Sequence, residues 1–290
     1  METEVVYKKK SQARSVWNRF RRNKIASVGL VIFLMIALCA IFADVLADYQ
    51  QLAITQNEEE RMSPPSAEHI FGTDNYGRDM FARIIHGARN SLAIGISSTL
   101  IALLLGCILG GLAAYYSGVV DNTIMRLLDM IACIPSILLA LTIVFALGAS
   151  MVNLLTAITI AIVPGFTRVI RSAMLPVIGQ EFIEAARACG ATDFRILARY
   201  IIPNAIGPIL VQGTMSVASL IMTAASLSFI GMGVQPPAPE WGSMLAEARE
   251  YIRYVPHMVI IPGMAIVLTA LSLNLIGDGL RDALDPRLKN

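Results

Sequence analysis

The sequence predicts an all-α membrane protein with six transmembrane helices and both termini on the cytoplasmic side. Three observations lead to this fold class: the composition, the charge-free runs, and the distribution of basic residues. Of the 290 residues, 56% are hydrophobic and 15% are charged, whereas a soluble domain carries about 25% charged residues. The mean hydropathy is +0.63. The composition is therefore that of a chain surrounded largely by lipid.

The charge-free runs locate the individual helices. A helix needs about 20 apolar residues to cross the ~30 Å hydrocarbon layer. One run is too long for a single helix and is expected to hold two, separated where Gly, Ser and Asn gather. The six predicted spans are, in order, 25–43, one within 90–120, two within 130–167 on either side of a break at 148–153, then 206–232 and 254–277.

The basic residues orient these spans. Most of the 23 Lys and Arg residues fall on one side if both termini are cytoplasmic, as the positive-inside rule requires. The predicted organisation is a basic cytoplasmic segment 1–24, a first membrane helix 25–48, an external segment 49–89 and a five-helix core 90–277. The core contains a cytoplasmic loop 168–205 and an external segment 233–256, and a cytoplasmic tail 278–290 follows it.

The sequence contains no recognisable catalytic, metal-binding or ion-coupling motif. The centres of the spans contain no ionisable residue, which disfavours an ion-coupled transporter. The phosphate-loop, H-E-x-x-H and G-x-S-x-G motifs are all absent. The three histidines and four cysteines show no metal-ligand spacing. We therefore predict no catalytic, cofactor-binding or metal-ligating residues, no nucleic-acid partner, and an energy source on another chain.

The cytoplasmic loop 168–205 carries the most informative pattern. A short helix is predicted up to Gly190, which takes a left-handed conformation at low cost. Thr192 or Asp193 is expected to cap a second helix, and Pro203 is expected to end it. Spacing alone leaves two interpretations open. The first helix either presents a surface to a partner, or rests on its own bundle or the lipid surface.

A resemblance favours the partner surface. Glu184-Ala185-Ala186, three residues, Gly190, nine residues, then Tyr200-Ile201-Ile202-Pro203 resembles the E-A-A-x3-G-x9-I-x-L-P loop of ABC importer membrane subunits. Tyr200 and Ile202 depart from that pattern but remain apolar. The resemblance implies a coupling helix that docks on an ATP-hydrolysing subunit. The residues it assigns to ATPase coupling are Glu184, Ala185, Ala186, Arg187 and Gly190.

Three further motifs narrow the resemblance to the dipeptide, oligopeptide and nickel permeases, and within them to the C-type subunit. They are Phe71-Gly72-Thr73-Asp74-Asn75-Tyr76-Gly77-Arg78-Asp79, the stretch 235–242 ending in Glu240-Trp241-Gly242, and the tail motif 277–286. The resemblance covers residues from about 15 to the end. The external motif residues Gly72, Asp74, Gly77, Arg78, Asp79, Glu240, Trp241 and Gly242 are expected to brace loops that meet a partner. Direct substrate contact, and for Trp241 a headgroup anchor, remain alternatives.

The resemblance implies a type I ABC importer permease fold in the bacterial inner membrane, forming half of a translocation pathway. The expected cargo is peptides, including dipeptides, oligopeptides and glutathione-like peptides; the same architecture carrying nickel or a metal chelate is the alternative. Expected partners are membrane lipid, a second homologous permease, one or two cytoplasmic ATPase subunits that bind ATP and Mg²⁺, and an external substrate-binding protein. The chain itself is expected to bind no cofactor. A membrane scaffold without a transport path is the hypothesis from another class.

Overall fold

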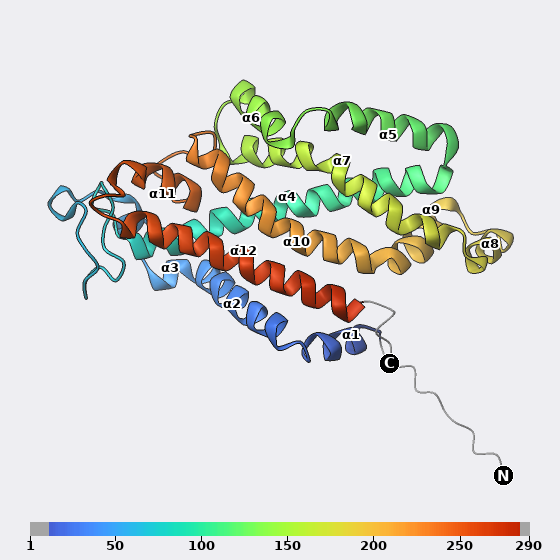
Figure 1. The fold of residues 1–290 in the computed structure, drawn as a ribbon, viewed down its shortest axis with the longest axis horizontal. Helices are drawn as coiled ribbons and strands as arrows, with labels where there is room; N and C mark the ends of the chain where they lie inside the picture. The colour runs from blue at the N-terminus through green and yellow to red at the C-terminus, as the bar shows by residue number, and fades with distance from the viewer. Residues whose placement is uncertain (1–11, 285–290) are drawn as a thin grey trace, which may run out of the picture.

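The computed structural model describes residues 12–284, which form an elongated helical bundle (Figure 1). Residues 1–11 of the predicted basic segment 1–24 lie outside the described residues, as does the end of the tail motif, Asp285 and Pro286. In chain order the helices are α1 (Gln12–Phe20), α2 (Lys24–Ile41), α3 (Ala43–Leu46), α4 (Met80–Tyr116), α5 (Gly118–Ala132), α6 (Ser136–Leu147), α7 (Met151–Ile178), α8 (Glu181–Ala188), α9 (Asp193–Ile196), α10 (Ile202–Phe229), α11 (Trp241–Ala248) and α12 (His257–Leu284). Wider π-type turns form η1 (Tyr49–Ile54) and η3 (Leu197–Ile201), and 3₁₀ turns form η2 (Glu58–Glu60) and η4 (Arg249–Tyr251).

Five of these helices or helix runs are long and apolar enough to cross a bilayer: α2, α4, α7, the run from α9 to α10, and α12. The third predicted span is corrected, because α5 and α6 meet at an angle of 78°. Pro135 has no N–H to continue α5, and α6 begins immediately after it. The 12 residues of α6 cover only about 18 Å. The described residues therefore hold five continuous spans, and the predicted count of six is reached only when the bent pair α5–α6 is counted as one span.

The break predicted at 148–153 between the third and fourth spans is confirmed. α6 ends at Leu147, and Gly148 follows with a φ of +88°. The Ser150 hydroxyl then caps α7 by accepting a hydrogen bond from the Asn153 N–H at 3.2 Å. A glycine that reverses the chain and a serine that caps the next helix produce this turn.

α4 and α7 pack along each other at the centre of the bundle. Their contact depends on small residues of α4, which let the two backbones approach closely. A Cβ added at Gly110 would lie 2.8 Å from the Thr167 carbonyl oxygen, and one added at Gly106 would lie 2.8 Å from the Ile170 side chain. α10 packs against α4 and α12, and α2 packs against the outer side of α12 (Figure 1).

The helices extend further than the charge-free runs predicted. α4 begins at Met80 rather than near residue 90, because Asp79 caps it and accepts from the Ala82 N–H at 2.8 Å. The external segment therefore ends at residue 79. α7 continues to Ile178 and α9 starts at Asp193, so the predicted loop 168–205 narrows to 179–192. α12 continues to Leu284, into the predicted tail.

Pro203 does not end the second helix of the loop, contrary to the prediction. The chain runs from α9 through η3 into α10, where Pro203 occupies one of the first positions. A proline is tolerated there because its missing N–H is not needed in the first turn. The Asn204 side chain also donates to the Tyr200 carbonyl oxygen at 2.6 Å. The result is one long helix with a widened turn.

The two ends of the bundle differ in character (Figure 1). One end, here the α8 end, carries α1, α8, α9 and the last turn of α12. The other, the α11 end, carries α11 and the segment between α3 and α4. Phe20, Ala26 and Ala283 form one cluster at the α8 end, so both described chain ends lie together there. This arrangement agrees with the prediction that the termini share one side, and it makes the α8 end the predicted cytoplasmic end.

Candidate functional site

α8 lies on the surface with one face buried. Ile183 is fully buried and Ala186 is 8% exposed, and both belong to an apolar cluster with α4, α7, η3 and α10. Glu184, Ala185 and Arg187 are exposed. Four of the five predicted coupling residues, including Gly190, therefore lie on the accessible surface, and Ala186 anchors the helix to the bundle.

The end of α8 is a complete Schellman motif, as the prediction for Gly190 requires. The Gly190 N–H donates to the Arg187 carbonyl at 2.9 Å, and the Ala191 N–H donates to the Ala186 carbonyl at 3.1 Å. Gly190 has a φ of +77°, and no atom would lie within 4 Å of an added Cβ. Glycine is therefore needed at this position for its backbone conformation and not for lack of space.

A shallow depression of about 360 Å³ opens beside α8. It is lined by small and apolar residues and one cation: Phe182, Ala185, Ala186, Cys189, Gly190, Ala191, Arg195 and Tyr200. Phe194 projects nearby on α9 and is 81% exposed. An exposed aromatic ring beside a small-residue surface is typical of a protein-binding site, in which aromatic side chains serve as anchors.

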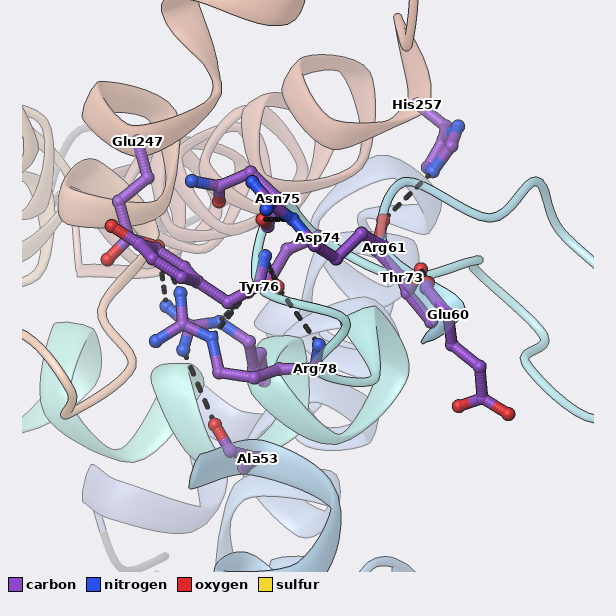
Figure 2. A network of polar contacts seen from close by, with 11 residues as sticks. Ala53, Glu60, Arg61, Thr73, Asp74, Asn75, Tyr76, Arg78, Glu247 and His257 are labelled. Atoms are coloured by element: carbon purple, nitrogen blue, oxygen red, sulfur yellow. Dashed lines mark hydrogen bonds and ion pairs between the residues drawn. The ribbon is translucent and has the colours of Figure 1, made fainter. Parts of the chain in front are cut away.

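At the α11 end, four charged side chains form a buried network (Figure 2). Asp74 accepts from Arg78 Nε at 2.7 Å and lies 3.3 Å from Arg83 Nε. Glu247 of α11 accepts from Arg78 Nη2 at 2.6 Å and from Arg83 Nη2 at 3.0 Å. Two guanidinium groups and two carboxylates thus neutralise one another, which burial of charge requires. The network joins the predicted external motif to α4 and α11.

The loop that carries this network is shaped by its glycines and by an aspartate. Asp74 Oδ1 accepts from the backbone N–H groups of Tyr76 and Arg78 at 2.8 and 3.0 Å. Gly72 and Gly77 have φ values of +74° and +75°, and an added Cβ at Gly77 would overlap the Asn57 backbone. These bends need glycine because L-residues with a Cβ rarely adopt them.

Asp79 links the loop to α4 and to a histidine. Besides capping α4, its carboxylate lies 2.7 Å from His69 Nδ1, and Glu60 lies 3.3 Å from Nε2. The hydrogen bond that His69 donates to Asp79 raises the pKa of His69 from its ordinary value, burial opposes that shift, and Glu60 adds to it. When it is protonated, His69 donates to both acids.

Glu240 is a buried cap of α11. Its carboxylate accepts from the N–H groups of Gly242 and Ser243 at 3.0 and 2.9 Å and from the Ser91 hydroxyl of α4 at 3.0 Å. A carboxylate that accepts from the first N–H groups of a helix is favoured by the helix dipole. Since Glu240 is 1% exposed, it holds α11 against α4 and does not reach the surface.

Trp241 and Gly242 complete that contact. The Trp241 ring is 1% exposed and its Nε1 donates to the Ile84 carbonyl at 3.1 Å. A Cβ on Gly242 would overlap the backbone of Ala225 in α10. Because the tryptophan is enclosed by the chain's own helices, its position fits a bracing role and not a headgroup anchor or a surface contact.

Comparison with known proteins identifies the family to which this chain belongs. Residues 91–290 match the family described as the inner membrane component of binding-protein-dependent transport systems. Residues 11–65 match the N-terminal transmembrane domain of oligopeptide transport permease C. The chain belongs to this permease family. The permease is accordingly an inner-membrane transport subunit, as the motifs predicted.

Several relatives match the permease over nearly its whole length. The dipeptide transport permease DppC of Alkalihalophilus pseudofirmus is 46% identical over 96% of this chain and 90% of its own. The di/tripeptide permease DppC of Pseudomonas aeruginosa is 43% identical over 97% and 94%, and the glutathione permease GsiD of Pectobacterium atrosepticum is 45% identical over 96% and 92%. The inward-facing MetNI methionine ABC transporter has the same fold, with a TM-score of 0.59 and 20% identity over 71% of this chain and 98% of that one.

Sequence reasoning missed several residues that complete both sites of the permease. Glu247 and Arg83 lie outside the motifs, and only the fold brings them to Asp74. Phe194 was treated as part of a loop helix. Tyr115 and Tyr116 were assigned to the second span, yet both hydroxyls reach Asp193. An aromatic pair at the end of a membrane helix was the available signal.

Proposed function

We propose that this permease imports peptides, as one half of a two-permease pathway driven by separate ATPase subunits. The full-length similarity to dipeptide, di/tripeptide and glutathione permeases at 43–46% identity supports this proposal. Relatives of this kind favour peptides over nickel as the cargo. The chain hydrolyses nothing and binds no cofactor; ATP and Mg²⁺ belong to the ATPase subunits, and an external binding protein delivers the peptide.

The α8 surface is the proposed docking site for the ATPase. Its small residues allow close approach, Phe194 supplies an apolar anchor, and Glu184, Arg187 and Arg195 supply polar registration. Closure of two ATPase subunits on ATP then displaces α8 as a rigid unit. The bundle alternates between outward-facing and inward-facing states, and the buried charged network keeps α11 and the external loop together during this motion.

The hydroxyl groups on α10 favour a transport path over a scaffold without one. Ser219, Thr223 and Ser226 share one side of α10 and donate to carbonyls about one turn earlier, so their polar groups are already satisfied. A wall of this kind presents oxygen atoms to a passing peptide without leaving unpaired donors.

Uptake measurements test the proposal. Cells lacking this chain, and the same cells complemented with it, are offered labelled dipeptide, glutathione and nickel in parallel, with and without ATP depletion. We expect ATP-dependent loss of peptide uptake that complementation restores. Loss of nickel uptake alone would overturn the peptide assignment, and uptake that survives ATP depletion would overturn ABC-type coupling. Normal uptake of all three in the deleted strain would contradict the proposal for these substrates.

A further inference from the structure

Asp193, the first residue of α9, is held from α4 by two neighbouring tyrosines. The Tyr115 hydroxyl donates to Asp193 Oδ1 at 2.7 Å, and the Tyr116 hydroxyl donates to Oδ2 at 2.9 Å. Successive side chains on a helix point about 100° apart, so the two phenols approach the carboxylate from different directions. Both oxygens of one carboxylate therefore bind to the end of a single helix through charge-assisted hydrogen bonds.

α8 joins the same cluster through Arg187. Its guanidinium carbon lies 5.0 Å from the centre of the Tyr115 ring, within cation–π range. The two tyrosine rings pack edge to face, with centres 5.2 Å apart. The proposed coupling helix, the helix after it and the end of α4 thus meet at one cluster, Arg187–Tyr115–Tyr116–Asp193.

α4 connects this cluster to the opposite end of the molecule. It runs without interruption through 37 residues, a length of about 55 Å. Tyr116 is its last residue, since Ser117 turns the chain with a φ of +52°. Its first turns carry Arg83, one of the four charges of the buried network that holds α11. A displacement applied at Tyr115 and Tyr116 therefore reaches α11 along one helix (Figure 1).

We propose that Tyr115, Tyr116 and Asp193 form a latch that transmits the displacement of α8 and α9 into α4, and so to the external end of the permease. This inference rests on the proposed docking of the ATPase on α8. The three side chains are positioning residues: they touch neither nucleotide nor substrate.

The latch resists sliding of α8 and α9 along the bundle, which the apolar packing beneath α8 does only weakly. Ile183 and Ala186 resist compression of α8 against the bundle, but apolar contact is non-directional and opposes sliding weakly. Hydrogen bonds prefer a narrow range of length and angle. Two of them on one carboxylate, both at the exposed surface, oppose sliding and separation of α9 and α4, so that displacement in either direction is passed to α4.

The competing explanation is local: Asp193 could serve only the N-terminus of α9, where an acid is favoured. The variant Tyr115→Phe/Tyr116→Phe separates the two explanations, because it removes both donors and leaves Asp193 in place. Tyr254→Phe is the matched control, since Tyr254 is 83% exposed and makes no side-chain hydrogen bond among the described residues. Asp193→Asn, which keeps the size and one acceptor oxygen, weakens the latch by a second route.

The test uses the permease purified together with its ATPase and partner permease chains. A fluorophore on Glu68→Cys, an exposed position of the external segment, reports motion at the α11 end in a background without Cys39, Cys107, Cys133 and Cys189. ATP hydrolysis and the fluorescence change on trapping with ADP and vanadate are recorded together. We expect the double Phe variant to assemble and hydrolyse ATP, while its fluorescence change falls about fivefold or more, the lower range of allosteric coupling.

The outcomes are distinct. A full fluorescence change in the double Phe variant, or none in the unmodified permease, overturns the latch. Loss in the Tyr254→Phe control to the same degree overturns it as well. Because the reporter needs no substrate, a permease that moves its external end on ATP but imports no peptide would contradict the proposed cargo and leave the latch intact.

Discussion

Replacing Glu247 by alanine tests the buried network at the α11 end most directly. Glu247 is the carboxylate shared by Arg78 and Arg83, whose side chains are each 1% exposed. Without it, Asp74 faces two guanidinium groups alone, and one positive charge remains buried without a partner. Removing one member of a buried ion pair costs about 3–5 kcal/mol.

We expect the lower end of that range, about 3 kcal/mol, for two structural reasons. Glu247 itself is 14% exposed, so water reaches the vacated site. Arg83 also keeps a hydrogen bond to the Ala53 carbonyl at 3.3 Å. At about 2 °C per kcal/mol for a chain of this size, the unfolding midpoint should fall on the order of 6 °C. Glu247→Gln, which keeps an acceptor oxygen but loses the charge, should fall roughly half as far.

The assay is thermal unfolding of the purified permease in detergent, with Glu250→Ala as the matched control. Glu250 lies three residues along the chain, is exposed, and forms no ion pair among the described residues. Its loss should stay within about 0.5 kcal/mol. Equal midpoints for Glu247→Ala and Glu250→Ala would refute the reasoning, because they would mean that the two arginines need no shared carboxylate.

Three further predictions follow from single positions. His69 has a raised pKa, so its stabilisation of the external segment is complete below pH ~6.5 and is lost as the pH rises through the raised value. The protection of amides 60–79 against hydrogen exchange, measured relative to the intrinsic rate at each pH, should fall on going from pH 6 to 8.5. His69→Gln should abolish that fall in protection, and an equal fall in the variant would contradict the role of His69. Gly190→Val should leave membrane insertion intact but uncouple ATP hydrolysis from uptake. Gly179→Val should leave the two coupled, because Gly179 has equally open surroundings but a φ of −78°. Normal uptake by the Gly190 variant would contradict the role of its backbone conformation. Phe194→Ala should weaken ATPase binding about tenfold, equivalent to about 1.4 kcal/mol. The unfolding midpoint should not change, because the ring is 81% exposed. Unchanged co-purification of the ATPase with the variant would exclude Phe194 as an anchor.

Much of the fold follows from hydropathy and from the Gly, Pro and capping residues that end or begin helices. The positions of α2, α7, α10 and α12 agree with the charge-free runs, since apolar length determines what crosses a bilayer. The ends of the helices were less predictable, because a charged residue does not by itself end a helix. Arg83 continues α4 since its charge is met by acids distant in sequence. The bend at Pro135 could not be predicted from the proline alone, because proline is often accommodated within membrane helices, as at Pro164 of α7.

The candidate sites likewise contain residues that the local sequence predicts and residues that only the tertiary fold brings together. Gly190, Gly72 and Gly77 were predictable because glycine at a turn reports a local backbone conformation. Glu240 and Trp241 could be singled out, but whether they faced a partner or the core depended on the position of α4 and α10. Contacts such as Tyr116 with Asp193 join residues far apart in the chain. No local pattern encodes them, so they emerge only with the fold.

The bend between α5 and α6 has a consequence for the lipid boundary of the permease. The residues from Cys133 to Pro135 are exposed, and α6 begins without a side-chain cap. The Cys133 and Ile134 N–H groups donate to carbonyls of α5, and the Pro135 carbonyl accepts from the Leu139 N–H. The bend therefore satisfies these backbone groups within the chain, which a non-helical turn in or near the hydrocarbon layer requires.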